Sequence, residues 1–470
     1  MINIKFGTDG WRALIAKEFT VENVTRVAYA TSLWLKEQKT QASVVVGNDP
    51  RFAGKMFSET VAQIFANAGI KVYLASNDFV STPMVSLGTV LLKADLGVII
   101  TASHNPPEYS GYKIKASYGG PATPDLIDQV ENMIPDRITL DLKSIEEYKQ
   151  AGLIEFVNLE DMYVKHVEEK FDMEAIRNSG MNFAYDAMYG AGQNAMRRLF
   201  PDISFLHAEY NPGFDGQAPE PIHKNLTELS DLIKLSDGEI DSGLATDGDA
   251  DRIGLYNSEG EFIDSHHIIL LLIHYLVKYK NIKGDVITTF SCTQKIADLC
   301  KLYELPHTIT KIGFKYICDL MVNSGREFIA GGEESGGIAI TGYIPERDGI
   351  WIGLTIWEFM AKTGKSLNEL IYEVYDEVGS FAVERYDLHL TENKKQEIIK
   401  SCKSNTYSKF DSYAVERIED MDGYKFHLGD DRWVMIRPSG TEPVLRVYAE
   451  AATSVDAFKI LDAAKATLLA

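Results

Sequence analysis

The chain has 470 residues, of which 45% are hydrophobic and 24% are charged, an ordinary balance for a globular protein with several cores. Its 68 acidic side chains outnumber the 47 basic ones, so the formal net charge is -21. A nucleic acid or an anionic membrane requires a basic surface, and this charge therefore argues against both as partners.

The cysteines and the N-terminus bear on the compartment of the protein. The four cysteines are widely spaced and form no CxxC pair, which favours free thiols in a reducing environment. The N-terminal segment 1–12 lacks the apolar stretch of a signal peptide. The longest apolar run, 268–277, is interrupted by His274 and is too short to cross a bilayer. We therefore expect a cytoplasmic protein.

The first third of the chain alternates between strand and helix signals. Runs rich in β-branched and apolar residues predict strands at 43–47, 71–75 and 96–100. Apolar residues at helical spacing predict helices at 57–68 and 83–93. This βαβαβ order is typical of a mostly parallel sheet, in which ligands bind at the loops after the carboxyl ends of the strands.

The same alternation recurs further along the chain. Later strands and helices are expected at 182–186, 242–246, 268–279, 285–289, 294–303 and 328–330. These repeated α/β units, each with a polar loop after a strand, predict three similar domains at 1–150, 151–258 and 259–378.

The C-terminal part has a different pattern. Spaced strands are expected at 386–390, 414–418, 424–428 and 433–436, with helices at 393–402 and 455–468. An antiparallel sheet with helices on one face fits this order, so we expect a fourth, α+β domain at 379–470.

The first segment with chemical potential is Thr101-Ala-Ser-His-Asn-Pro106, directly after a predicted strand. A serine at such a turn, followed by a helix-breaking proline, can expose its hydroxyl at the edge of a sheet. An ordinary turn built from Ser, Asn and Pro explains the segment equally well. The G-x-S-x-G context of an esterase nucleophile is absent from it.

A second segment, Asp247-Gly-Asp-Ala-Asp-Arg252, places three carboxylates at alternate positions of a short loop. Carboxylate oxygens suit Mg²⁺ or Ca²⁺, and such crowding without a cation costs stability through repulsion. A calcium loop of the EF-hand type is excluded, because its sixth position is Arg252 rather than glycine and its twelfth is Ser258 rather than glutamate. A solvated acidic turn remains the alternative. Arg252 is placed to hold a phosphate beside a metal.

Two further segments offer polar groups on glycine-containing loops. Gly332-Glu-Glu-Ser-Gly-Gly337 carries two carboxylates and a hydroxyl, which can accept hydrogen bonds from the hydroxyls of a sugar. Arg437-Pro-Ser-Gly-Thr441 combines a guanidinium, two hydroxyls and a glycine, as a phosphate-binding nest does. Taken alone, each segment is also explained by a turn. Together, the four segments indicate phosphoryl transfer to and from a sugar.

With these four segments in this order, the sequence resembles the α-D-phosphohexomutases, the family of phosphoglucomutases and phosphomannomutases. Further matches to the family lie at 6–12, 111–113, 313–315 and 345–349. The resemblance covers essentially the whole chain. It implies a heart-shaped fold of three mixed α/β domains and a smaller C-terminal α+β domain around a central cleft.

The resemblance also implies the reaction and its machinery. Phosphate would move between C1 and C6 of a hexose through a phosphoserine and a hexose 1,6-bisphosphate, which also serves as activator. The implied metal is Mg²⁺, bound by Ser103, Asp247, Asp249 and Asp251. The implied catalytic residues are Ser103, Arg12, Arg252 and Lys113, with His104 either contacting the phosphate or bracing the loop. The implied substrate-binding residues are Lys315, Glu333, Ser335, Arg437, Ser439, Gly440 and Thr441.

The roles implied for the two arginines and for Lys113 each require a particular electrostatic environment. Arg12 and Arg252 would steady the transferring phosphoryl group, since charge neutralisation supplies much of the catalysis of phosphoryl transfer. Lys113 would act as general acid/base, which calls for a lowered pKa, and we expect neighbouring cations to provide it. Residues 6–10 are expected to be a scaffold for Arg12.

The sugar is indicated by the loop at 332–337. It ends in two glycines, whereas enzymes that act on both glucose and mannose often carry histidine at the last position. This favours glucose, with a phosphomannomutase or a dual glucose/mannose mutase as the alternative. A glucosamine mutase is disfavoured because its sugar loop usually reads differently.

Three questions stay open at this point. A phosphatase could use the same metal and serine to pass phosphate to water. A non-catalytic sugar-phosphate binder is the alternative from another class, and it predicts damage to Ser103, Lys113 or the aspartates, all of which are intact. Both a monomer and a homodimer are compatible with the sequence.

Overall fold

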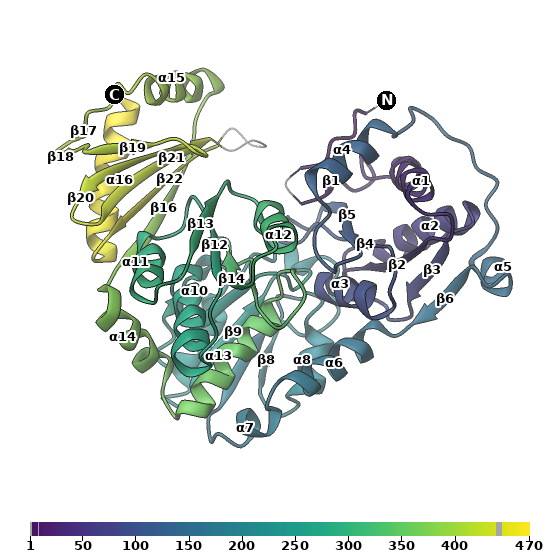
Figure 1. Ribbon diagram of the computed structural model, residues 1–470, viewed down its shortest axis with the longest axis horizontal. Coiled ribbons are helices and arrows are strands. Elements are labelled where there is room, and N and C mark those ends of the chain that lie inside the picture. The colour runs from purple at the N-terminus through teal and green to yellow at the C-terminus, as the bar shows by residue number, and fades with distance from the viewer. Residues whose placement is uncertain (1, 8, 439–443) are drawn as a thin grey trace.

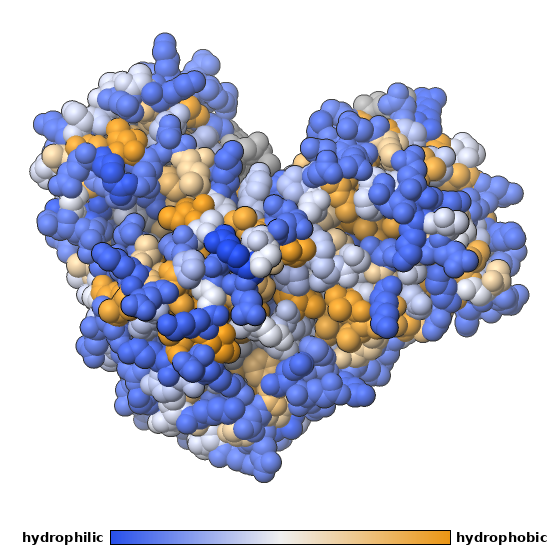
Figure 2. Space-filling model, in the orientation of Figure 1, coloured by the Kyte–Doolittle hydropathy of each residue, from blue (hydrophilic) through white to orange (hydrophobic). Residues whose placement is uncertain are grey.

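The computed structural model describes residues 2–7, 9–438 and 444–470. Four units of mixed helix and sheet follow one another along the chain (Figure 1). The first and last units form two arms, and a notch opens between them in the space-filling view (Figure 2). The expected phosphohexomutase architecture of three α/β domains and a C-terminal α+β domain around a cleft is confirmed.

The first unit is a six-stranded sheet with helices on both faces. In chain order it contains β1 (Trp11–Leu14), α1 (Val21–Gln38), β2 (Ser43–Asn48), α2 (Gly54–Asn67), β3 (Lys71–Ala75), α3 (Thr82–Leu91), β4 (Leu96–Ile100), β5 (Tyr109–Ala116), α4 (Pro124–Asn132), α5 (Ile145–Gln150) and β6 (Ile154–Val157). The strand order is β1-β5-β4-β2-β3-β6, and only β5 runs against the other strands, so it pairs antiparallel with both β1 and β4. Because side chains alternate along a strand, Val44 and Val46 pack towards α1 and α2, whereas Val45 packs towards α3 and α6. The expected boundary at residue 150 falls before β6, which returns to this sheet beside β3.

The second unit carries the aspartate loop on a β-hairpin. Its elements are α6 (Leu159–Lys170), α7 (Met173–Arg177), β7 (Phe183–Asp186), α8 (Gln193–Leu199), β8 (Ser204–Leu206), η1 (Phe214–Gly216), η2 (His223–Asn225), α9 (Thr227–Leu235), β9 (Ser242–Thr246), β10 (Ile253–Tyr256) and β11 (Phe262–Ile263). The strand order is β11-β10-β9-β7-β8, with β7 parallel to its neighbours and β10 antiparallel to β9. Residues 247–252 connect β9 to β10, so the loop is held at both ends by buried strands.

The third unit has a four-stranded sheet in the order β13-β12-β14-β15. Its elements are α10 (Ser265–His274), the π-helical turn η3 (Tyr275–Tyr279), β12 (Asp285–Thr289), α11 (Gln294–Leu302), β13 (His307–Thr310), α12 (Phe314–Asn323), β14 (Phe328–Gly332), β15 (Ile338–Ile340), α13 (Gly349–Thr363) and α14 (Leu367–Val378). The glutamate-containing loop connects β14 to β15, which pair antiparallel.

The fourth unit is an antiparallel sheet in the order β16-β22-β21-β20-β19. Its elements are β16 (Ala382–His389), α15 (Glu392–Lys403), β17 (Lys409–Phe410), β18 (Tyr413–Ala414), β19 (Arg417–Glu419), β20 (Tyr424–Gly429), β21 (Arg432–Pro438), β22 (Val444–Ala451) and α16 (Ser454–Leu469). The sheet buries alternate residues such as Leu445 and Val447 under α16. Its other face meets the third unit through a small cluster of Phe290, Trp433, Met435 and Tyr448. The single strand expected at 414–418 is instead divided between β18 and β19.

The largest apolar cluster links the first three units, and a second one fills the α1 and α2 face of the first sheet. One cluster of buried side chains runs from the α3 face of the first sheet through α6 and α8 to α10 and α13. The fourth unit has a separate core. Within the described part of the chain, no helix is long and apolar enough to cross a membrane.

Candidate functional site

Ser103 lies in the loop after β4, with its backbone in the left-handed region (φ 52°). Its N–H donates to Thr101 Oγ1 (2.9 Å), which helps to hold this conformation. Its hydroxyl donates to Asp247 Oδ2 (2.6 Å), and His104 Nδ1 lies 3.3 Å from the same hydroxyl oxygen. The serine is only 1% exposed. The predicted nucleophile therefore points at the aspartate loop of the second unit.

Arg51, which sequence reasoning missed, braces the serine loop from beneath. Its guanidinium donates to the backbone carbonyls of Ser103 (2.6 Å), Asn105 (2.7 Å), Pro106 (2.8 Å) and Tyr109 (3.1 Å). Its Nε donates to the Asp49 carboxylate (3.2 Å). These five contacts match the five N–H groups of an arginine, so the side chain is fully used in fixing the loop. The only sequence signal was a charged pair directly after the buried strand β2.

The three aspartates of the β9–β10 connection form a compact, buried carboxylate group. Asp247, Asp249 and Asp251 have no exposed surface, and each brings an oxygen to within 4.8 Å of the others. Burial, followed by the charges of Asp249 and Asp251, raises the pKa of Asp247 well above its usual range. Asp249 Oδ1 and Asp251 Oδ1 are buried and accept no hydrogen bond from any described residue. Convergent carboxylates with such unused oxygens fit a hard divalent cation such as Mg²⁺.

The serine loop and the aspartate loop pack directly against each other. A Cβ on Gly248 would lie 2.5 Å from the Ser103 carbonyl oxygen, so only glycine allows this approach. Thr82, at the start of α3, donates from its N–H to the Asp249 carbonyl (2.9 Å) and from its hydroxyl to the Asp249 carboxylate (2.5 Å). The first and second units are therefore held in a fixed register at this point.

Lys113, on β5, is surrounded by carboxylates. Its Nζ lies 2.8 Å from both Asp9 Oδ2 and Asp249 Oδ2, and 3.0 Å from Asp251 Oδ2. Burial alone would lower the pKa of the lysine, but these three carboxylates outweigh it and raise the pKa above its ordinary value. The expectation that neighbouring cations lower this pKa is therefore wrong for this arrangement.

Arg347 is a second residue of the cluster to which sequence reasoning gave no role. Its Nη2 lies 2.7 Å from Asp9 Oδ2 and 2.8 Å from Asp251 Oδ2, and its side chain is buried over the Phe314 ring. It thereby joins the N-terminal segment, the aspartate loop and the third unit. Asp9, expected to belong to a scaffold for Arg12, is itself part of the charged network. The signal for both residues was the family match at 6–12 and 345–349.

The other predicted catalytic residues surround the serine. Arg12, on β1, donates from Nη1 to Asn105 Oδ1 (2.8 Å) in the serine loop. Arg252 follows the aspartates, and its Nη1 lies 3.8 Å from the Glu220 carboxylate. Burial and then the positive charge of Arg252 hold the pKa of His104 well below its usual range. His104 is therefore a neutral ring beside the serine hydroxyl.

The sugar loop lies against the same cluster. Ile253, next to Arg252, donates its N–H to the Gly336 carbonyl (3.2 Å). Glu333 is buried, and its Oε1 accepts the N–H of Gly313 (2.9 Å). Burial, reinforced by the charge of Glu334, raises the pKa of Glu333 to about 7.

Three of the remaining substrate-binding candidates, Ser335, Lys315 and Arg437, belong to the described residues. Ser335 is half-buried at its turn, and Lys315 stands near the start of α12 with Nζ 5.4 Å from the centre of the Tyr316 ring. Arg437 lies near the end of β21 and donates from Nε to Asp422 Oδ1 (3.3 Å). Ser439, Gly440 and Thr441 lie outside the described residues.

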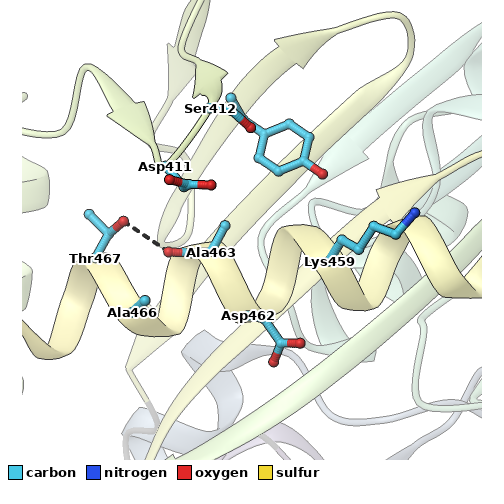
Figure 3. A pocket seen from close by; sticks show the side chains of 8 residues that line it. Asp411, Ser412, Lys459, Asp462, Ala463, Ala466 and Thr467 are labelled. Carbon is cyan, nitrogen blue, oxygen red and sulfur yellow. Dashed lines mark hydrogen bonds between the residues drawn. The ribbon is translucent and has the colours of Figure 1, made fainter.

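A separate cavity of about 590 Å³ lies in the fourth unit, between α16 and the turn that joins β17 to β18 (Figure 3). Its lining includes Asp411, Tyr413, Lys459 and Asp462. Because α16 covers the face of the sheet opposite to the cluster with Phe290, this cavity is not part of the site around Ser103.

Comparisons with known proteins agree with this arrangement. Models of the phosphoglucomutase/phosphomannomutase family match four successive stretches: alpha/beta/alpha domain I at 3–139, domain II at 161–260, domain III at 264–378 and the C-terminal domain at 394–466. The fold and the site thus define the class of the protein as a phosphohexomutase.

Similar proteins cover essentially the whole chain. A solved structure of a candidate phosphomannomutase from Thermus thermophilus is 30% identical, with a TM-score of 0.86 and 100% of both chains covered. A phosphoglucomutase/phosphomannomutase of Thermococcus kodakarensis is 28% identical over 97% of this chain and 96% of its own length. A phosphoglucosamine mutase of Methanocaldococcus jannaschii is 29% identical over 97% of this chain and 96% of its own length. The chain belongs to the phosphoglucomutase/phosphomannomutase family of α-D-phosphohexomutases.

Proposed function

We propose that the chain is a Mg²⁺-dependent mutase that moves phosphate between C1 and C6 of glucose through a phosphoserine at Ser103. The observation that carries the proposal is the contact of the Ser103 hydroxyl with Asp247 (2.6 Å), inside a buried group of three aspartates. A hydroxyl that faces a candidate cation site, with Lys113 and two arginines nearby, is suited to exchanging a phosphoryl group.

Asp247, Asp249 and Asp251 would hold the cation together with an oxygen of the phosphorylated Ser103. The bound Mg²⁺ would neutralise charge on the phosphoryl group and orient it. Arg12 is tied to the serine loop through Asn105, so its guanidinium is held close to the transferring group. Arg252 is proposed to contact that group from the side of the aspartate loop.

The transfer itself is a balanced exchange. The bond from phosphorus to Ser103 Oγ breaks, a bond to the free sugar hydroxyl oxygen forms, and the proton of that hydroxyl replaces the phosphoryl group on the serine. Lys113 is proposed to donate a proton to Ser103 Oγ as the phosphoryl group leaves and then to take the proton of the sugar hydroxyl in its place. Its carboxylate neighbours raise its pKa and keep it in the protonated form from which this exchange begins. His104, held neutral by its lowered pKa, is proposed to brace the serine loop.

The sugar and its second phosphate would be held by the third and fourth units. Glu333 and Ser335 are proposed to bind the sugar hydroxyls, and Lys315 and Arg437, with residues 439–441, the phosphate that does not react. The resulting hexose 1,6-bisphosphate would turn over in the cleft and return its other phosphate to Ser103. A site that accepts phosphate from either end of the sugar suits this reorientation.

The choice of glucose rests on the sequence of the sugar loop, Glu333 to Gly337. A phosphomannomutase or a dual glucose/mannose enzyme is the alternative. The names of similar proteins also include phosphoglucosamine mutases, so the amino sugar belongs in the same test. The proposal includes the cytoplasm as the compartment, in which the four buried cysteines would remain thiols.

A substrate panel tests the proposal. The 1-phosphates of glucose, mannose and glucosamine are incubated with Mg²⁺ and a trace of the matching 1,6-bisphosphate, and the 6-phosphates are measured. We expect glucose 1-phosphate to be converted with the highest kcat/KM. Equal rates with mannose would identify a dual enzyme, and preference for glucosamine would overturn the choice of sugar. Release of inorganic phosphate would indicate a phosphatase, and no reaction with any phosphohexose would overturn the mutase.

A further inference from the structure

At the edge of the fourth unit, Arg437 is contacted by a neighbouring turn. The turn between β19 and β20, residues 420–423, lies directly beside it. Gly423, with φ 96°, makes this approach possible, because a Cβ there would lie 2.8 Å from the Ile436 carbonyl oxygen and 3.1 Å from Arg437 Cβ. The turn brings Asp422 to the Nε side of the arginine (3.3 Å).

The carboxylate of Asp422 also reaches across to the third unit. While Oδ1 accepts from Arg437, Oδ2 accepts the N–H of Ile312 at 2.8 Å. The next amide along the chain, that of Gly313, donates to Glu333 Oε1 at 2.9 Å. Two successive amides of one short segment are therefore held by two carboxylates, one from the fourth unit and one from the sugar loop.

The contact with Arg437 has a consequence for its orientation. A carboxylate on Nε fixes the rotation of the guanidinium, and bidentate binding of phosphate depends on the orientation of that planar group. A lysine at the same position has no Nε–H and could not be oriented in this way. Asp422 can therefore orient an arginine at position 437 but not a lysine.

We propose that Asp422 is a positioning residue that couples phosphate binding at Arg437 to the sugar loop through Ile312, Gly313 and Glu333. The proposal rests on the proposed function insofar as Arg437 binds phosphate and Glu333 binds sugar. Binding of a phosphate would order Arg437 and the 420–423 turn, and the Asp422 carboxylate would transmit that order to the amides at 312 and 313.

Kinetics of single and double variants provide the first test. Asp422→Ala is expected to raise KM for the phosphohexose about tenfold, the size expected for a lost charge-assisted contact, with a smaller change in kcat. Asp420→Ala, an exposed residue of the same turn, is the matched control and should leave KM unchanged. In an Arg437→Lys background, Asp422→Ala should change KM less than about twofold. Equal effects in both backgrounds, or equal effects of the two aspartate variants, would overturn the proposal.

A binding experiment tests the coupling without any turnover. Hydrogen exchange of a peptide that covers 311–313 is followed in the whole chain with and without saturating inorganic phosphate. We expect phosphate to slow exchange there in the unmodified chain and in Asp420→Ala, but not in Asp422→Ala. Unchanged exchange in the unmodified chain would overturn the coupling. If this protection is seen and no phosphohexose is converted, the proposed function fails while the positioning role stands.

Discussion

At the scale of single residues, Ser103 carries the sharpest prediction. Ser103→Ala should remove at least about 99% of mutase activity, on the order of the loss expected when a nucleophile is deleted. The folded chain should survive, because the hydroxyl makes a contact with Asp247 that a water can replace. Activity and thermal unfolding are measured on the same preparation. A variant that turns over at a normal rate would contradict the phosphoserine.

Arg51 is predicted to matter through the serine loop it braces. Arg51→Lys keeps the charge but has only three N–H donors for the five oxygens now bound. Three of these oxygens, the carbonyls of Ser103, Asn105 and Tyr109, depend on the arginine more than those of Asp49 and Pro106, which also accept from Thr101 and Tyr109. Each buried, unpaired oxygen costs about 1–3 kcal/mol, and we expect kcat to fall at least about tenfold. Chemical denaturation and steady-state kinetics check the two effects. Normal kcat in a destabilised protein would mean that Arg51 supports the fold and not the position of Ser103.

The residues that sequence reasoning found and those it missed differ in kind. Ser103 and the three aspartates stand together in short segments whose side-chain types already suggest phosphate or metal chemistry. Arg51 contacts the serine loop 52 residues further along the chain, and Asp9 and Arg347 contact each other over a separation of 338 residues. The charged pair after β2 and the family matches marked their segments, but no local pattern gave these residues a role. The role of Arg51 arises when the first unit folds, whereas those of Asp9 and Arg347 arise only when the first, second and third units are packed together.

At the scale of elements, the approach of two loops at Gly248 can be tested with one methyl group. Gly248→Ala would place a Cβ 2.5 Å from the Ser103 carbonyl oxygen, so one of the two loops must move. We expect a loss of about 1–3 kcal/mol in stability. We also expect that more Mg²⁺ is needed for half-maximal activity, as measured by metal titration. Gly213→Ala is the matched control, since a Cβ there lies 3.4 Å from a side-chain atom of Asn211 and meets no backbone.

Element prediction succeeded where burial produces a strong pattern. The strands expected at 71–75, 96–100, 242–246 and 285–289 coincide with β3, β4, β9 and β12, each of which lies within a sheet. The antiparallel β5 was missed, because its glycine, lysine and tyrosine residues do not read as a buried strand. The strand also holds Lys113 in the site, so its lysines are buried by pairing with carboxylates and not by apolar packing.

At the scale of the whole molecule, the contact between the third and fourth units should depend on pH. Glu450 is buried there, accepts the Trp433 Nε1–H (2.8 Å), and burial raises its pKa to about 7. Burial likewise lowers the pKa of the neighbouring Lys425 to about 8. A carboxyl with a raised folded-state pKa contributes stability that is complete below about pH 4.5 and is lost as the pH rises through about 7.

Glu450→Gln should remove this dependence. Relative to the unmodified chain, the variant should gain stability on the order of 2 kcal/mol between about pH 5 and pH 8. The loss of a negative charge also lowers the pKa of Lys425 further. This adds to the gain in stability of the variant over the unmodified chain as the pH rises. Thermal unfolding of both proteins at the two pH values checks the prediction. A stability difference between the variant and the unmodified chain that stays constant or falls as the pH rises would contradict it.

The separation of the hydrophobic cores has a consequence for the thermal unfolding of the protein. One apolar cluster links the α3 face of the first sheet to the second and third units, and a second cluster fills the other face of that same sheet, whereas the fourth unit has its own core. Because the first sheet joins the two larger clusters, heating should melt the chain as two cooperative blocks. Ser103 and the aspartates belong to the larger block, whereas Arg437 belongs to the smaller. Scanning calorimetry should therefore resolve two heat-absorption peaks, and a ligand that spans both blocks should draw them together into one.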